Sequence, residues 1–141
     1  MSGTHVPADL RRLVGERAGW QCEYCLAPDG LVFKAHQMDH TIAEKHGGAT
    51  TPENLAMACL VCNNRKGTDL ASLDPLDGQL VPLFNPRRLR WADHFRLHGG
   101  RIVPVTAIGR VTERLLQFNT PRRLSERELF LAAGYIRVPG V

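Results

Sequence analysis

The sequence predicts an α+β fold in a single domain. The chain has 141 residues, of which 43% are hydrophobic, so it is long and apolar enough for one domain with its own core. Segments with the helical spacing of apolar residues alternate with apolar runs that are short enough to be strands. All four cysteines occur in two Cys-x-x-Cys pairs, which indicates that a bound metal ion holds part of this fold together.

The N-terminal half is predicted to contain two helices with short strands between them. The first helix covers residues 7–17, because its apolar residues form one stripe and Gly19 follows as a helix end. Gly47 and Gly48 indicate a loop before the last of the strands. The predicted strands cover residues 31–34, 37–42 and 55–58, and the second helix covers residues 62–70.

The C-terminal half is also predicted to mix strands and helices, which are separated by turn residues. In its last helix, Ser125 and Glu128 have the spacing of a capping box. Trp91 and Phe95 stand four residues apart, which favours core residues over a platform for stacking bases. The predicted elements are strands at 80–84 and 101–106, and helices at 91–97, from about 109–112 onward, and at 125–134.

The cysteines form two close pairs, Cys22 with Cys25 and Cys59 with Cys62. Two intervening residues let both sulfur atoms of a tight turn face one ion, and two such pairs supply the four thiolates of a structural zinc site. The alternatives are a redox dithiol or two unrelated pairs, but a redox Cys-x-x-Cys normally occurs once, in a thioredoxin-like pattern. Because four thiolates leave no open coordination position, we expect this zinc to be structural and not catalytic.

The charge is distributed unevenly along the chain. Residues 1–66 carry seven basic and seven acidic side chains, whereas residues 67–141 carry eleven arginines and seven acidic side chains and supply the whole net charge of +4. Arginine suits forked contacts to phosphate groups, and a basic half favours a polyanionic partner. The alternative is a solvated basic face on an ordinary domain. Within the basic half, Arg87, Arg88, Arg90 and Arg96 are candidates for lining a groove that binds a nucleic-acid backbone.

The sequence shows neither a leader peptide nor a membrane anchor. Residues 1–9 lack a basic start and an apolar stretch, and no run approaches the roughly 18 apolar residues of a membrane span. We therefore expect a cytoplasmic protein in a reducing compartment, without disulfide bonds and without a membrane partner.

The segment between the cysteine pairs contains Asp39-His40, Gly47-Gly48 and Asn54-Leu55, and Asn63 follows the last cysteine. With these residues, positions 10–70 resemble the HNH endonuclease family. The name-giving pattern has His where this chain has Asn63. The C-terminal half is similar to the tail of a bacterial subgroup of short stand-alone members. The resemblance implies a zinc-stabilised ββα-metal core, with an N-terminal helix and a basic C-terminal α/β extension.

The resemblance also implies a metal-dependent endonuclease that hydrolyses phosphodiester bonds in DNA. Asp39 and Asn63 would hold one divalent ion, and oxygen ligands of this kind suit Mg²⁺ or Mn²⁺. His40 would activate the attacking water, and Asn54 would brace the loop and orient His40. Adjacent residues of a regular strand point to opposite faces, so the strand has to bend or end at Asp39-His40 if both act on one phosphate.

For other polar residues near the motif, simple exposure to solvent is an alternative to a role in the site. Arg65 and Lys66, after Asn63, either contact phosphate or form a solvated helix face. We leave His36 and His46 outside the site, because a loop histidine is more often merely solvated.

Two other functions fit parts of the sequence. A zinc-stabilised nucleic-acid-binding module without cleavage activity accounts for the cysteines and arginines, but not for the four motif residues. A module that binds an acidic protein partner is the weaker alternative. We therefore predict one nuclease domain over residues 1–141, with a core at about 7–73 and a basic extension at about 74–141. The sequence leaves open the oligomeric state, the preferred metal, and whether the nucleic acid is DNA or RNA.

Overall fold

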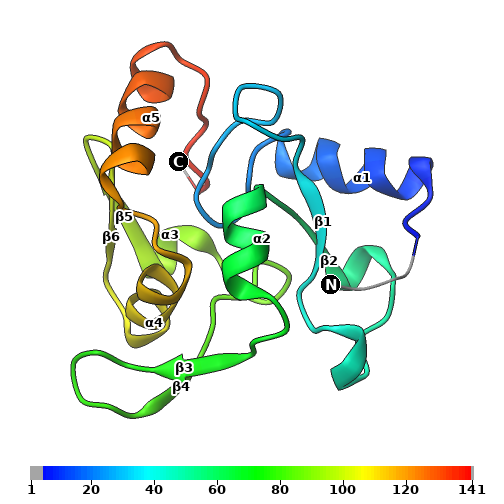
Figure 1. Cartoon of the computed structure of the whole chain (residues 1–141), viewed down its shortest axis with the longest axis horizontal. Helices are drawn as coiled ribbons and strands as arrows, with labels where there is room; N and C mark the ends of the chain where they lie inside the picture. The colour runs from blue at the N-terminus through cyan, green and yellow to red at the C-terminus, as the bar shows by residue number, and fades with distance from the viewer. Residues whose placement is uncertain (1–4, 141) are drawn as a thin grey trace.

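A computed structural model describes residues 5–140, and it confirms the α+β fold (Figure 1). Residues 1–4, on which part of the leader-peptide expectation depends, lie outside the described residues. The helices are α1 (Ala8–Ala18), α2 (Leu60–Lys66), α3 (Trp91–His94), α4 (Ala107–Leu116) and α5 (Pro121–Ala132), with 3₁₀ turns η1 (Glu44–His46) and η2 (Pro52–Asn54). The strands are β1 (Gln37–His40), β2 (Leu55–Ala58), β3 (Ala71–Leu73), β4 (Leu80–Pro82), β5 (Phe95–His98) and β6 (Arg101–Pro104). No helix in this part of the chain is long and apolar enough to cross a membrane.

The N-terminal half is built on the antiparallel hairpin of β1 and β2, which leads directly into α2. All four residues of β2 are buried because both of its faces are covered. Leu55 and Met57 pack with Val14 of α1, whereas Ala56 and Ala58 belong to the core that contains the cysteines. This alternation follows from the two-residue period of a strand.

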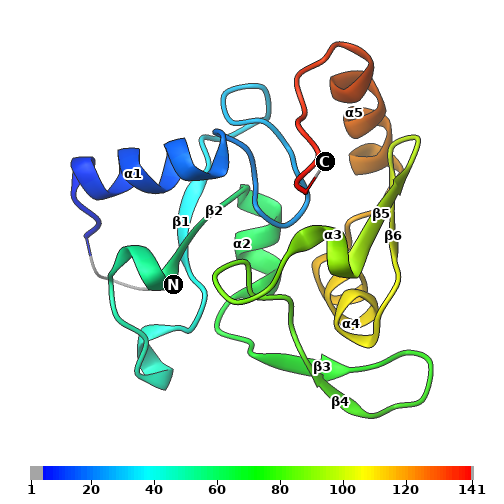
Figure 2. The same ribbon diagram turned by 180° about the vertical axis from the view of Figure 1, so that it is seen from behind.

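The C-terminal half packs on the cysteine side of that hairpin. Figures 1 and 2 show α2 between the β1–β2 hairpin and the elements α4, β5 and β6. The cysteines share one hydrophobic core with Phe84, Trp91, Phe95 and Phe118. The rings of Trp91 and Phe95 are buried with centroids 5.1 Å apart, so the prediction that they are core residues is confirmed. The extension is therefore packed onto the cysteine half, not attached as a separate unit.

Several predicted elements differ from the observed ones. Residues 31–34 form bends instead of a strand, and the side chain of Phe33 is 86% exposed. The helix predicted at 91–97 ends at His94, because Phe95 and the next residues pair with β6. The last helix begins at Pro121, a favourable first-turn residue, so Ser125 lies inside α5 and does not cap it. Strand β3, which was not predicted, pairs with β4.

Candidate functional site

The four cysteines meet at one buried point, although 33 residues separate the two pairs in the sequence. Their sulfur atoms all lie within 4.8 Å of one another, and the Sγ atoms of Cys25 and Cys59 are 3.6 Å apart. Tetrahedral zinc–thiolate bonds of about 2.3 Å imply sulfur–sulfur distances of about 3.8 Å. The residues present therefore fit a structural zinc ion, as the sequence predicts.

Each cysteine pair is arranged as a tight turn around its first sulfur. The backbone N–H of Cys25 donates to Sγ of Cys22, and the N–H of Cys62 donates to Sγ of Cys59, both over 3.4 Å. The second of these contacts caps the start of α2. Burial raises the pKa of the Cys22 and Cys62 thiols, so binding of zinc as a thiolate complex would release protons.

Strand β1 ends at His40, so Asp39 and His40 lie at the last two positions of the strand. Gln37 and Asp39 share the face of β1 that meets α2, because Gln37 contacts Asn63 and Asp39 contacts Lys66. His40 belongs to the other face by the alternation of a strand. The strand thus ends where the sequence argument requires it to bend or end.

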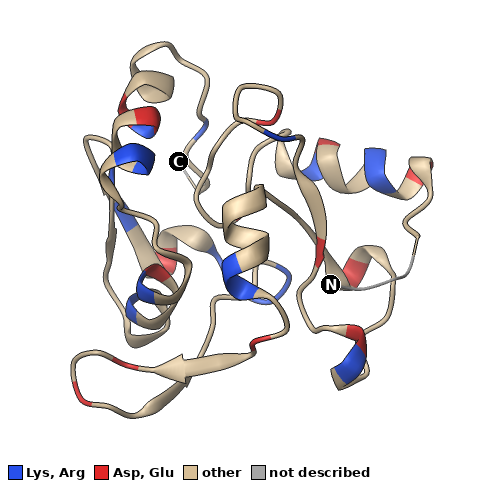
Figure 3. Cartoon of the chain, in the orientation of Figure 1, with Lys and Arg blue, Asp and Glu red and all other residues tan. Residues whose placement is uncertain are grey.

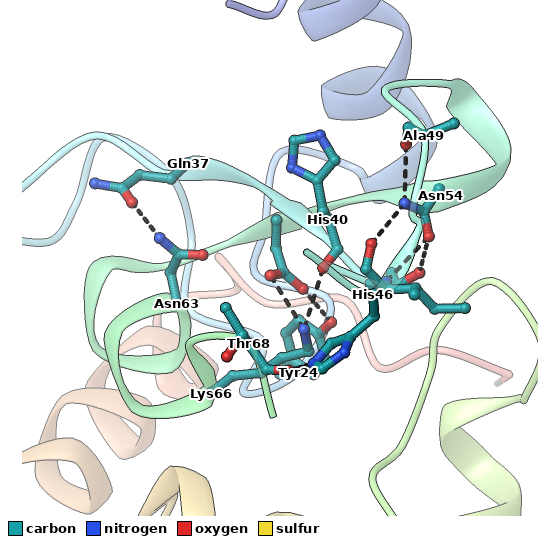
Figure 4. A network of polar contacts seen from close by, with 12 residues as sticks. Tyr24, Gln37, His40, His46, Ala49, Asn54, Asn63, Lys66 and Thr68 are labelled. Carbon is teal, nitrogen blue, oxygen red and sulfur yellow. Dashed lines mark hydrogen bonds and ion pairs between the residues drawn. The ribbon is translucent and has the colours of Figure 1, made fainter. Parts of the chain in front are cut away.

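The Asp39 carboxylate is 4% exposed and accepts hydrogen bonds at both oxygens. Tyr24 donates its hydroxyl to Oδ2 over 2.6 Å, and Nζ of Lys66 lies 3.3 Å from Oδ1 (Figure 4). Burial raises the pKa of Asp39 above its usual value, although Lys66 and Tyr24 both act to lower it. The structure therefore provides a desolvated carboxylate with one cationic partner already beside it.

The ring of His40 lies at the start of the loop that connects β1 to β2. Its Nε2 atom is 2.9 Å from the hydroxyl of Thr50, and the side chain is largely buried. A ring held by one hydroxyl contact has a defined direction, which a general base needs.

Asn54 braces this loop with four hydrogen bonds from one amide (Figure 4). Its Nδ2 atom donates to the carbonyls of Ile42 and Ala49, and its Oδ1 atom accepts from the Thr41 hydroxyl and the Ile42 N–H. No hydrogen bond between Asn54 and His40 occurs in the described chain. Asn54 instead fixes Ala49, whose neighbour Thr50 contacts the His40 ring.

The glycine pair that precedes Thr50 is required by this brace. A Cβ atom on Gly48 would lie 1.7 Å from the carbonyl oxygen of Ile42 and 2.8 Å from Nδ2 of Asn54. Gly47 has a φ of 93°, in the region that favours glycine. The loop can therefore close around Asn54 only with glycine at position 48.

Asn63 lies in the middle of α2 and faces β1. Its Nδ2 atom donates to the side-chain oxygen of Gln37. Within residues 5–140, its Oδ1 atom accepts no hydrogen bond from the protein, so this oxygen has no protein donor. Helix α2 thus brings the side chains of Asn63 and Lys66 to the same face of β1 as Asp39.

The remaining polar candidates contact other parts of the protein. His36 is 1% exposed and bonds through Nε2 to the Ala27 carbonyl, whereas Nε2 of His46 contacts the Thr68 carbonyl. Arg87 forms an ion pair with Glu23, and Arg96 donates to two nearby backbone carbonyls. Figure 3 shows basic positions on α2, α4 and α5 with acidic ones among them on α4 and α5. Arg87 is therefore engaged inside the protein, whereas Arg96 is exposed and its part in a groove stays a prediction.

Four residues that the sequence argument did not assign support this site: Tyr24, Gln37, Thr50 and Lys66. Lys66 was considered only for phosphate contact or a solvated helix face. Its 3% exposure and its ion pair with Asp39 contradict the solvated alternative. These roles depend on contacts between separate elements, so no local pattern indicates them.

Comparison with known proteins points to the same segment. Residues 22–69 match the sequence model of the HNH endonuclease family. A stretch of 69 residues is 38% identical to the CRISPR-associated endonuclease Cas9 of Corynebacterium diphtheriae. This stretch is 48% of the present chain but only 6% of that protein. No solved structure matches the chain.

The matched segment contains both cysteine pairs, the end of β1, the braced loop and α2. The family was predicted from the residues that this geometry brings together, and the comparison confirms it. Residues 22–69 of this chain therefore match the HNH endonuclease family.

Proposed function

We propose that the protein is a metal-dependent endonuclease that hydrolyses phosphodiester bonds in DNA. The observation that supports this most is the position of Asp39 and Asn63 on facing sides of β1 and α2, with His40 at the end of the same strand. This arrangement supplies a carboxylate and an amide oxygen for a hard divalent ion, and a histidine base at the end of the strand that carries the carboxylate. We further propose that residues 1–141 act as one nuclease domain.

The residues divide the reaction between them as follows. Asp39 and Asn63 would hold one Mg²⁺ or Mn²⁺ ion, which supplies Lewis-acid stabilisation of the charge that develops on the phosphate. His40 would accept the proton of the attacking water through the ring nitrogen that does not contact Thr50. Thr50 holds the ring in place, and Asn54 holds the loop that carries Thr50.

The first experiment is cleavage of supercoiled plasmid by the zinc-loaded protein, with Mg²⁺, with Mn²⁺ and with EDTA. The His40→Ala variant tests the base, and His98→Ala is the matched control, because His98 is an exposed histidine at the tip of the β5–β6 hairpin. We expect nicking with Mg²⁺ or Mn²⁺, no cleavage with EDTA, and a rate about 10²–10⁴-fold lower for His40→Ala alone.

Other outcomes would change the proposal. Equal cleavage by His40→Ala would remove this histidine from its role. If folded, zinc-loaded protein bound plasmid without cutting it in any metal, the zinc-stabilised binding module without cleavage would become the better account.

A further inference from the structure

We propose that Lys66 is a built-in counter-cation of the catalytic metal site. Its ammonium group neutralises Asp39 in the free protein and keeps the affinity of the site for a divalent ion low until a substrate phosphate arrives. This inference rests on the proposed function, because it assumes that Asp39 is a metal ligand. Lys66 acts through Asp39, so it is a positioning residue.

The contacts of Lys66 place a positive charge directly beside the carboxylate that is proposed to bind the ion. Its Nζ atom is 3.3 Å from Oδ1 of Asp39 and 3.2 Å from the carbonyl oxygen of His40 (Figure 4). Tyr24 donates to the other carboxylate oxygen. Both oxygens of Asp39 therefore have a donor before any metal is present, and one of these donors carries a full charge.

Stabilisation of the fold does not readily explain why Lys66 is buried beside Asp39. A buried ion pair contributes little net stability, because the cost of removing both charges from water offsets their attraction. Lys66 follows Asn63 by three residues, so both side chains lie on one face of α2 and both reach β1. The buried charge is thus placed beside the two side chains that are proposed to bind the metal.

Electrostatics then determines how the site responds to ion and substrate. An ammonium group and a divalent cation repel each other at short range, and burial weakens the screening by water. A phosphodiester adds a negative charge that both cations can share. Ion and substrate should therefore each raise the affinity for the other, and the coupling has to be reciprocal.

The test measures Mn²⁺ binding directly, by electron paramagnetic resonance of the free ion, in the zinc-loaded chain of 141 residues without nucleic acid. Lys66→Met removes the charge, Lys66→Arg keeps it, and Asp39→Asn removes the proposed ligand. We expect Lys66→Met to bind Mn²⁺ about tenfold more tightly or better than the parent protein. Lys66→Arg should stay close to the parent protein, and the double variant Asp39→Asn, Lys66→Met should lose binding.

A folding control accompanies these measurements, since Lys66→Met leaves the buried Asp39 without its cationic partner. Its melting temperature without Mn²⁺ should fall, and the added Asp39→Asn change should restore part of the loss. If Lys66→Met does not fold, Lys66→Gln keeps a polar partner without the charge, and the same gain in Mn²⁺ affinity is expected.

The effect of the substrate is tested in the His40→Ala background, in which cleavage is expected to be slow. Mn²⁺ affinity is measured within minutes of mixing, before residual cleavage, with and without a short DNA duplex, in the protein that retains Lys66 and in the one that also carries Lys66→Met. The duplex should raise the Mn²⁺ affinity more in the protein that retains Lys66. An equal increase in both would overturn the coupling.

Failure of this inference is distinguishable from failure of the proposed function. If the parent protein binds Mn²⁺ through Asp39 but Lys66→Met binds no more tightly, only the role of Lys66 is wrong. If Asp39→Asn changes Mn²⁺ binding in neither background, Asp39 is not a metal ligand, and both proposals fail.

Discussion

The guanidinium group of Arg123 donates from Nη2 to the Sγ atom of Cys62 over 3.0 Å, across 61 residues of sequence. The same nitrogen lies 3.7 Å from Sγ of Cys59. On the next turn of α5, Nε of Arg127 donates to the carbonyl of Cys25 over 3.2 Å. Four thiolates around one Zn²⁺ ion carry a net negative charge, so α5 supplies cationic donors to a buried anionic centre. The C-terminal half thereby takes part in the zinc site.

The first prediction concerns this contact. Arg123→Met should release zinc to a chromophoric chelator faster and bind it more weakly, because loss of an outer partner of a metal ligand costs about 10–100-fold in affinity. The control is Arg122→Met, since Arg122 is the neighbouring arginine with a side chain that is 83% exposed. Equal zinc retention in the two variants would show that the Arg123 contact does not stabilise the centre.

The second prediction concerns the zinc ligands themselves. Cys59→Ser should abolish cooperative unfolding of the N-terminal half, because zinc binding in small domains contributes about 10–16 kcal/mol, as much as the stability of a whole domain. Circular dichroism during thermal unfolding measures this loss. Prolonged chelation should produce the same loss in the parent protein and little further change in the variant. A sharp, zinc-independent transition in Cys59→Ser would contradict a structural role for the metal.

The sequence alone predicted the parts of the site that depend on local spacing. The Cys-x-x-Cys turns follow from such spacing, and the resemblance to the HNH family implied that Asn54 braces its loop; the strand predicted at 37–42, however, ends two residues earlier, at His40. The match to residues 22–69 confirms the family that these residues indicated. The strand at 55–58 was also predicted with its observed limits, because its whole length is apolar and buried.

Other features were not predictable because they depend on partners far away in the chain. Lys66 is buried only because Asp39, 27 residues earlier, lies opposite it. Phe95 leaves the predicted helix because Pro104 and its neighbours offer a strand to pair with. Arg127 is one of the eleven arginines of the basic half, yet it is 4% exposed and donates to backbone carbonyls. Net charge from sequence therefore overstated how many arginines are free to meet a polyanion.

The third prediction concerns the pH dependence of stability in the C-terminal half. Asp74 is 1% exposed and accepts two hydrogen bonds from the Arg110 side chain of α4, over 3.0 and 2.8 Å. These bonds lower the pKa of Asp74. A carboxyl with a lowered folded-state pKa stabilises the fold above its unfolded pKa of about 3.9 and loses that contribution as the pH falls through the folded value.

Asp74→Asn should accordingly lower the melting temperature at pH 7, and the difference from the parent protein should shrink progressively below about pH 4. Asp69→Asn, at an exposed position, is the control and should change little. A difference that stays constant from pH 7 down to acid would show that the Asp74 charge does not contribute.

The last prediction concerns Asn54, whose side-chain amide donates two hydrogen bonds and accepts two. Asn54→Ala removes four hydrogen bonds and leaves loop groups unpaired, at a cost of about 1–3 kcal/mol for a buried group. Asn54→Asp keeps the acceptor side toward Thr41 and Ile42. It also places a carboxylate oxygen against the carbonyls of Ile42 and Ala49, which need a donor.

We therefore expect Asn54→Asp to be no more stable than Asn54→Ala in chemical denaturation, although aspartate has nearly the same shape as asparagine. Both variants should keep zinc and lose most of the cleavage activity, because the loop that carries Thr50 no longer holds the His40 ring. If Asn54→Asp matched the parent protein in stability, the two donated bonds would contribute nothing, and the loop would have to be held by Gly48 and the 3₁₀ turns alone.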